Sequence, residues 1–97
     1  DNGYFSSGKG LKEYEWLKKN AARFGFCQVY TDKGSTQRKG YEMEKWHWSY
    51  LPIAKTYLNK YNELISYKDI KGFTGSYLAP KLRAIEDYVN GIDAACH

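Results

Sequence analysis

The stretch Glu44-Lys45-Trp46-His47-Trp48-Ser49-Tyr50 decides the fold, because its aromatic residues have strong strand character. We expect residues 41–50 to be extended and to pair back on an earlier strand. On a flat strand, positions 44 and 47 point to opposite faces of the sheet. A bulge, or a turn out of the strand at Lys45-Trp46, is therefore needed if Glu44 and His47 are to meet.

A helix and the earlier strand are predicted upstream of this stretch. Apolar residues recur there at helical spacing, at Leu11, Tyr14, Leu17, Ala21, Ala22 and Phe24. Gly25 follows as a C-terminal stop, and residues 26–30 then alternate apolar and polar as a half-buried strand does. Residues 31–40 are polar, with Gly34 and Gly40 as turn points, and predict an exposed loop.

Two further helices are predicted downstream. Pro52 suits the first turn of a helix, where its missing N–H costs nothing. One apolar stripe at helical spacing follows, made of Ile53, Ala54, Tyr57, Leu58, Tyr61, Leu64 and Ile65. Residues 72–76 form a break, and the last helix is marked by Leu78, Leu82, Ile85, Tyr88 and Val89 and stops near Gly91.

Size and composition exclude several classes of protein. A chain of 97 residues makes one small domain at most. An aromatic content of 18%, with ten tyrosines, is too high for a disordered chain, and no apolar run is long enough to span a membrane. The net charge of +4 is spread along the chain, and the aromatic residues follow core periodicities, so we expect no nucleic-acid partner.

The start of the chain predicts a fragment. It opens at Asp1 without an initiator methionine or a signal peptide. Two strands alone rarely stand in water without a covering layer. We therefore expect an upstream part of the same protein to supply the other strands of the sheet.

The two cysteines leave two possibilities open. Cys27 and Cys96 lie far apart and form no CxxC motif. A disulfide between them would suit a periplasmic or secreted protein. Two unpaired thiols fit the sequence equally well, because spacing alone does not settle connectivity.

Glu44 and His47 are the candidate catalytic residues. A carboxylate three residues before an imidazole, flanked by Trp46 and Trp48, suggests half of a metal-hydrolase site, with His47 binding zinc and Glu44 acting as base. A catalytic zinc usually takes three protein ligands, and nothing else in the chain completes the set. The alternative is a strand histidine bonded to backbone, with Glu44 in water and both tryptophans in the core.

Four motifs, in order, carry a family resemblance. They are "EYEWLKKNA" at residues 13–21, "FGF" at 24–26, "GY" at 40–41 and "EKWHWSY" at 44–50. The run, roughly residues 10 to 65, resembles the C-terminal half of the zinc D-alanyl-D-alanine carboxypeptidases, the peptidoglycan-trimming family that includes vancomycin-resistance carboxypeptidases. Lys45 stands where proline is frequent in that family, and Ser49 replaces a common arginine, which leaves the subclass and the substrate preference open.

The resemblance implies a fold and a set of roles. The fold is α+β, a small antiparallel sheet packed with helices of the hedgehog/DD-peptidase kind, and residues 1–97 are the C-terminal part of a single metallopeptidase domain. Glu44 corresponds to the catalytic base and His47 to the last zinc ligand, while Trp46 and Trp48 flank the substrate. The other two zinc ligands, a histidine and an aspartate, belong to an upstream motif that is absent here.

The implied function is zinc-dependent hydrolysis of peptidoglycan stem peptides by the intact protein, in the periplasm or outside the cell. These 97 residues alone are then expected to be inactive. The alternative is a non-catalytic module that grips peptidoglycan and has lost its metal. An intact upstream histidine and aspartate would favour the enzyme, and their loss would favour the binding module.

Overall fold

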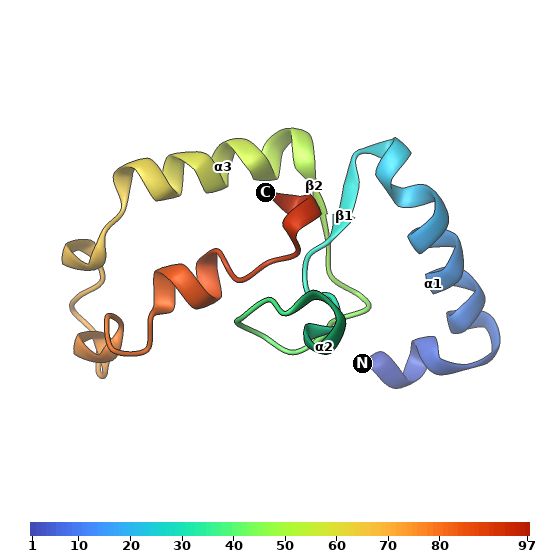
Figure 1. Cartoon of the computed structure of the whole chain (residues 1–97), viewed down its shortest axis with the longest axis horizontal. Coiled ribbons are helices and arrows are strands. Elements are labelled where there is room, and N and C mark those ends of the chain that lie inside the picture. The colour runs from blue at the N-terminus through green and yellow to red at the C-terminus, as the bar shows by residue number, and fades with distance from the viewer.

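The centre of the molecule is a two-stranded antiparallel sheet, seen in a computed structural model that describes all 97 residues. Strand β1, Phe26–Gln28, pairs with β2, Trp48–Tyr50, so that Phe26 faces Tyr50 and Gln28 faces Trp48. Helices surround this sheet, which confirms the α+β class (Figure 1). The prediction of an extended segment over residues 41–50 is wrong for residues 41–47, which are irregular.

Helix α1, Gly8–Asn20, precedes the sheet and follows a 3₁₀ turn at Asn2–Ser6. A second 3₁₀ turn, Ala21–Phe24, extends it to Gly25, whose φ of 87° lies in the left-handed region. A side chain at Gly25 would also meet the ring of Tyr50 at 3.0 Å. Both the backbone conformation and the nearby ring therefore require glycine here, and the predicted stop is confirmed.

The segment after β1 was expected to be a loop, but it contains the short helix α2, Lys33–Thr36. The carboxylate of Asp32 accepts a hydrogen bond from the backbone N–H of Ser35 at 2.9 Å and so caps this helix. One capped turn within a polar segment is a local arrangement that hydrophobic periodicity does not reveal.

Helix α3, Leu51–Leu64, begins with Pro52 in its first turn, as predicted. Its apolar residues do not form one buried stripe. Ala54, Leu58 and Tyr61 are half-buried on one face of the helix. Ile53, Tyr57 and Leu64 of the predicted stripe are exposed.

The prediction of one continuous last helix is wrong. The chain instead forms 3₁₀ turns at Tyr67–Asp69 and Ser76–Leu78 and a π-helical turn at Ala84–Val89. Arg83 has a left-handed φ of 54°, which a continuing α-helix does not allow. The backbone N–H of Ala84 reaches back five residues to the carbonyl of Ala79, at 3.0 Å.

The C-terminal segment returns to the sheet and is fixed there. Cys96, in the last 3₁₀ turn, Ala94–Cys96, forms a disulfide with Cys27 of β1. The backbone N–H of Asp93 donates to the carbonyl of Val29 at 2.9 Å, and its carboxylate accepts from the hydroxyl of Thr31 at 2.6 Å. Of the two possibilities for the cysteines, the structure has the disulfide.

Strand β1 is covered on both faces. Tyr14 of α1 lies against the face that carries Gln28, and Cys96 lies against the face that carries Cys27. Cys27, Gln28 and Val29 are consequently all buried, and the expected half-buried alternation does not hold.

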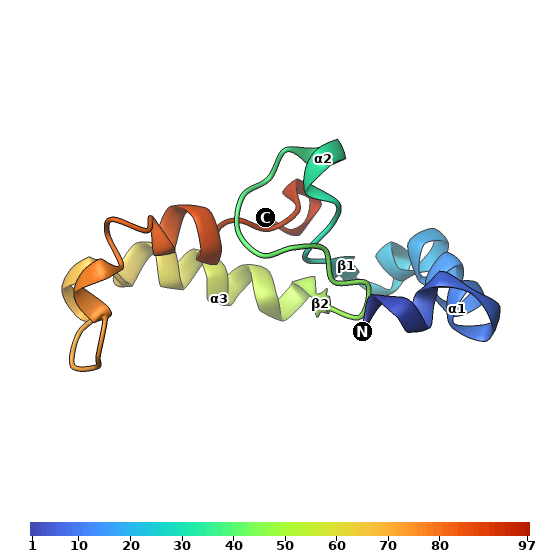
Figure 2. The ribbon, with the colours of Figure 1, turned by 90° about the horizontal axis from the view of Figure 1, so that it is seen from below.

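The molecule is elongated. Its radius of gyration is 15.4 Å, whereas a compact domain of this length has about 12–13 Å. Helix α3 and the turns that follow it form an arm that extends away from α1 and the sheet (Figures 1 and 2). None of the helices combines the length and the apolar character that a membrane crossing requires.

Candidate functional site

A turn at the end of the sheet brings Glu44 and His47 together. The backbone N–H of Val29 donates to the carbonyl of His47 at 3.1 Å, and that of Glu44 donates to the carbonyl of Tyr30 at 2.9 Å. Two residues after β1, Val29 and Tyr30, therefore lie opposite the four residues Glu44 to His47. The two extra residues, Lys45 and Trp46, form a turn in which the N–H of His47 donates to the carbonyl of Glu44 at 3.3 Å.

The two side chains meet at this turn. Nδ1 of His47 lies 3.0 Å from Oε2 of Glu44. The side chain of His47 is 43% exposed and that of Glu44 27% exposed, so both groups remain reachable from solvent. This is the geometry that the sequence required, a turn at Lys45-Trp46 that puts the carboxylate and the imidazole on one side.

The backbone around Glu44 is held by amide side chains. Asn2 donates from Nδ2 to the carbonyl of Met43 and accepts at Oδ1 from the N–H of Lys45, both at 2.9 Å. Gln28 donates to the carbonyl of Glu44 at 3.4 Å. The residues on both sides of Glu44 are thus fixed to the start of the chain, and Glu44 itself is fixed to β1.

Gln28 is in turn fixed by Tyr14. The hydroxyl of Tyr14 donates to Oε1 of Gln28 at 2.8 Å, in a buried contact. Burial raises the pKa of the Tyr14 hydroxyl, and the hydrogen bond to Gln28 opposes that shift. Helix α1 therefore contributes to the position of Glu44 through a chain of two hydrogen bonds.

Sequence patterns do not identify Asn2, Gln28 and Tyr14 as supports of Glu44. Asn2 lies 43 residues from the N–H that it binds, and no spacing rule connects the two. A polar residue inside an otherwise apolar strand, at Gln28, was the one available signal.

Aromatic rings border the imidazole. The ring of Tyr30 lies edge-on to that of His47, with centroids 5.0 Å apart, and also contacts Tyr41 at 5.4 Å. Burial raises the pKa of Tyr30, and the negative charge of Glu44 adds to the shift. Tyr30 therefore stays a neutral phenol beside the pair.

Arg38 secures the loop that carries Tyr41. Its guanidinium donates to the carbonyls of Tyr41 and Thr31 and lies over the ring of Tyr30, 5.3 Å from the centroid. A loop arginine bound in this way fixes the backbone and is not directed to solvent.

The comparison with known families agrees with this geometry. A family model described as D-alanyl-D-alanine carboxypeptidase, VanY, matches residues 4–53, which is more than half of the chain. The chain belongs to the VanY D-alanyl-D-alanine carboxypeptidase family. No curated protein and no solved structure matches it.

The match to the VanY family includes the turn and both strands but ends at the start of α3. Glu44 and His47 therefore lie within the part of the chain that matches the family. The arm formed by α3 and the following turns lies almost entirely outside it.

The residues present do not form a complete metal site. No group of three or more histidine, cysteine, aspartate or glutamate side chains is close enough to hold a metal ion. Both cysteines are in the disulfide. A VanY-type zinc could take the imidazole of His47 as one ligand, with Glu44 beside it, and two further protein ligands would have to come from elsewhere.

The two tryptophans differ in their surroundings. Trp46, in the turn, is 49% exposed. Trp48 is half-buried, lies against Tyr14 with centroids 6.4 Å apart, and donates from its indole N–H to the carbonyl of Lys45 at 2.9 Å. Trp48 thus helps to close the turn, and the substrate contacts expected of both rings stay predictions.

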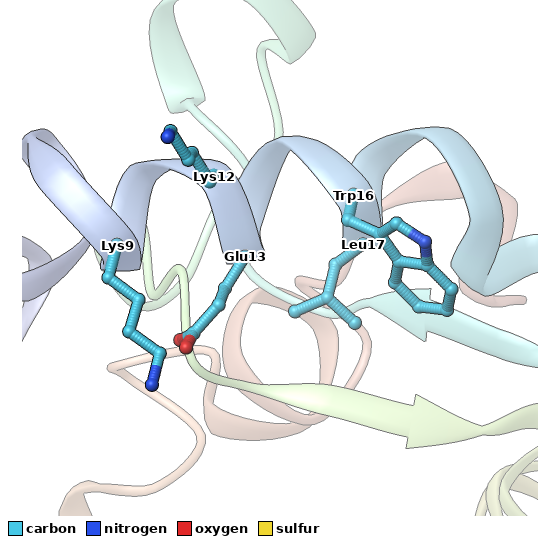
Figure 3. Close-up of a pocket in the computed structure, with 5 residues that line it drawn as sticks. All are labelled: Lys9, Lys12, Glu13, Trp16 and Leu17. Carbon is cyan, nitrogen blue, oxygen red and sulfur yellow. The ribbon is translucent and has the colours of Figure 1, made fainter.

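No hollow of the surface is lined by the pair itself, although one of about 630 Å³ includes Met43 and Trp48, which adjoin the pair in sequence. One of about 470 Å³ runs along α1, where Lys9, Glu13 and Leu17 extend on one side of the helix (Figure 3). Another, of about 430 Å³, is lined only by apolar side chains, namely Trp16, Leu17, Ala21, Phe24, Phe26 and Trp48. Neither these hollows nor the other two include Glu44 or His47.

Proposed function

We propose that this protein is a zinc-dependent D-alanyl-D-alanine carboxypeptidase-type hydrolase of peptidoglycan stem peptides, with Glu44 as catalytic base and His47 as a zinc ligand. The observation that carries the proposal is the turn that sets Glu44 Oε2 3.0 Å from His47 Nδ1 within the family match. A peptidase that trims the cell wall acts in the periplasm or outside the cell.

Each residue has a defined task. A bound zinc polarises a scissile carbonyl and lowers the pKa of its water to about 7. His47 holds one coordination position through a ring nitrogen. Glu44 takes a proton from the attacking water and returns it to the leaving amine. Its backbone is held by Tyr30 and Gln28, so the carboxylate is positioned before substrate arrives.

We further propose that residues 1–97 are the C-terminal part of a single metallopeptidase domain. The remaining part then supplies a histidine and an aspartate as zinc ligands and covers the apolar surface beside the sheet. Trp16 and Phe24 are both more than half exposed there, and Phe26 and Tyr50 are only slightly less so. The open position of the Glu44–His47 pair, outside every hollow, also supports a site completed by other residues.

The substrate contacts are assigned to Trp46 and Trp48. Trp46 lies in the turn between Glu44 and His47 and is 49% exposed, so its ring is available to a peptide bound at the metal. Trp48 holds the carbonyl of Lys45 and so fixes the turn that carries Trp46.

The test is hydrolysis of a peptide ending in D-alanyl-D-alanine by the full-length protein and by its Glu44→Gln variant. Loss of a general base lowers kcat by roughly 10²–10⁴-fold. Glu42→Gln is the matched control, since Glu42 carries the same charge two residues away, is 88% exposed and forms its one ion pair with Lys33. A Glu44→Gln enzyme as fast as Glu42→Gln would refute the role of Glu44. Binding of the peptide without any hydrolysis by the wild type would favour the non-catalytic module.

A further inference from the structure

The far end of the arm has a surface of its own. We call residues 66–83 the tip. They contain the 3₁₀ turns Tyr67–Asp69 and Ser76–Leu78 and the loop between them. The tip lies at the end of the molecule opposite α1 and outside the family match (Figures 1 and 2). Its chemistry therefore does not follow from the peptidase site.

Large apolar side chains of the tip are exposed to solvent. Phe73 is 61% exposed, Tyr77 is 80% exposed and Leu82 is 61% exposed. Neither Phe73 nor Tyr77 packs against another ring. Added side chains at Gly72 and Gly75, which flank Phe73, would meet no atom within 4 Å. The loop thus stands free of the rest of the chain.

The same segment is positively charged. It contains four basic residues, Lys68, Lys71, Lys81 and Arg83, and one acidic residue, Asp69. The carboxylate of Asp69 is engaged by the backbone N–H of Ser66 at 2.9 Å. Arg83 pairs with Asp87, whereas the three lysines form no ion pair. The segment that bears the exposed rings therefore also carries three lysines that no carboxylate neutralises.

We propose that the tip docks on the surface of an anionic phospholipid bilayer. Phenylalanine and tyrosine rings lose contact with water at the headgroup level, and lysines gain about a fivefold increase in affinity each from anionic lipids. A single-stranded polyanion would instead need a groove that tracks its backbone. No hollow of the molecule is lined by a residue of the tip, so the tip offers no such groove.

The experiment is co-sedimentation of the protein with vesicles. One set of vesicles is pure phosphatidylcholine, and the other contains equal parts of phosphatidylcholine and phosphatidylglycerol. We expect binding to the anionic vesicles to be at least about tenfold tighter. Equal binding to both, or binding to neither, overturns the proposal.

Two charge variants test whether the tip is the part of the molecule that binds the vesicles. The triple variant Lys68→Gln/Lys71→Gln/Lys81→Gln should weaken binding to anionic vesicles about 100-fold. The control is Lys9→Gln/Lys12→Gln/Lys19→Gln, which removes the same charge from α1, at the other end of a molecule 45 Å long. That distance exceeds the screening length of about 10 Å, so the control should change binding less than about threefold. Equal losses in both variants contradict a tip-specific contact.

A third variant separates lipid insertion from simple charge attraction. Phe73→Ser/Tyr77→Ser keeps the charge and removes two exposed rings, so it leaves folding intact, as circular dichroism would verify. We expect at least a tenfold loss of vesicle binding. Unchanged vesicle binding, or binding to soluble polyglutamate as tight as that to anionic vesicles, would show a polyanion site and overturn the bilayer proposal.

Discussion

The disulfide between Cys27 and Cys96 should be the largest single contribution to the stability of this chain. It joins residues 69 apart in sequence, and the double variant Cys27→Ala/Cys96→Ala removes it. Closing a loop of that length lowers the entropy of the unfolded chain by an amount worth about 4 kcal/mol at 25 °C. A domain of this size has a total stability of about 5–15 kcal/mol.

Few other contacts of the folded state hold the C-terminal segment once the disulfide is removed. The C-terminal segment keeps the hydrogen bond from Asp93 to Val29 and the one from Thr31 to Asp93. Each such contact contributes about 1 kcal/mol. Only nine residues of the whole chain are buried, and Cys27 and Cys96 are two of them.

Urea unfolding followed by circular dichroism measures the effect. With a slope of about 1–2 kcal/mol per molar urea, the midpoint of the double variant should fall by about 2–4 M. Reduced wild-type protein is the control and should unfold within about 1 kcal/mol of the variant. A variant as stable as the oxidised wild type would refute the reasoning, and so would two thiols that react in the native, unreduced protein.

Three further predictions concern single residues. Gly72→Ala should lower the free energy of unfolding by about 1–2 kcal/mol, and Gly25→Ala should lower it more, because both glycines have φ of 87° but only an alanine at position 25 would press its methyl group on a tyrosine ring. Equal losses in urea unfolding would contradict that contact. Asn2→Ala should lower the unfolding free energy by about 1–2 kcal/mol and slow the proposed peptidase, because the two hydrogen bonds on either side of Glu44 are lost. No change in either the unfolding free energy or the peptidase rate would refute the role of Asn2 in positioning Glu44. Burial raises the pKa of Tyr14, so its contribution to stability is present below about pH 10 and is lost as the pH rises through the raised pKa. The stability of Tyr14→Phe should therefore fall less steeply than that of the wild type between about pH 9 and 11, and equal slopes would contradict this.

Local signals in the sequence predicted the parts of the fold that local chemistry decides. Gly25 ends its helical segment because only glycine tolerates that backbone conformation so close to Tyr50. Pro52 begins α3 because it needs no N–H partner there. The turn at Lys45-Trp46 could be anticipated as a condition, since strand geometry separates positions 44 and 47.

Contacts between distant parts of the chain could not be predicted in this way. The two hydrogen bonds of Asn2 join residues more than 40 positions apart. The last helix was expected to be continuous because its apolar spacing is helical, yet the left-handed backbone of Arg83 interrupts it. The pairing of Cys27 with Cys96 required the path of the C-terminal segment, which spacing does not give.

The most direct test of the central claim, that Glu44 and His47 belong to one zinc site, is the zinc content of the full-length protein by elemental analysis. Wild type and Glu44→Gln should each hold about one zinc per chain, because the base lies outside the ligand set, whereas His47→Ala should hold far less. A His47→Ala protein that keeps its zinc, or a wild type that never binds it, would contradict the assignment.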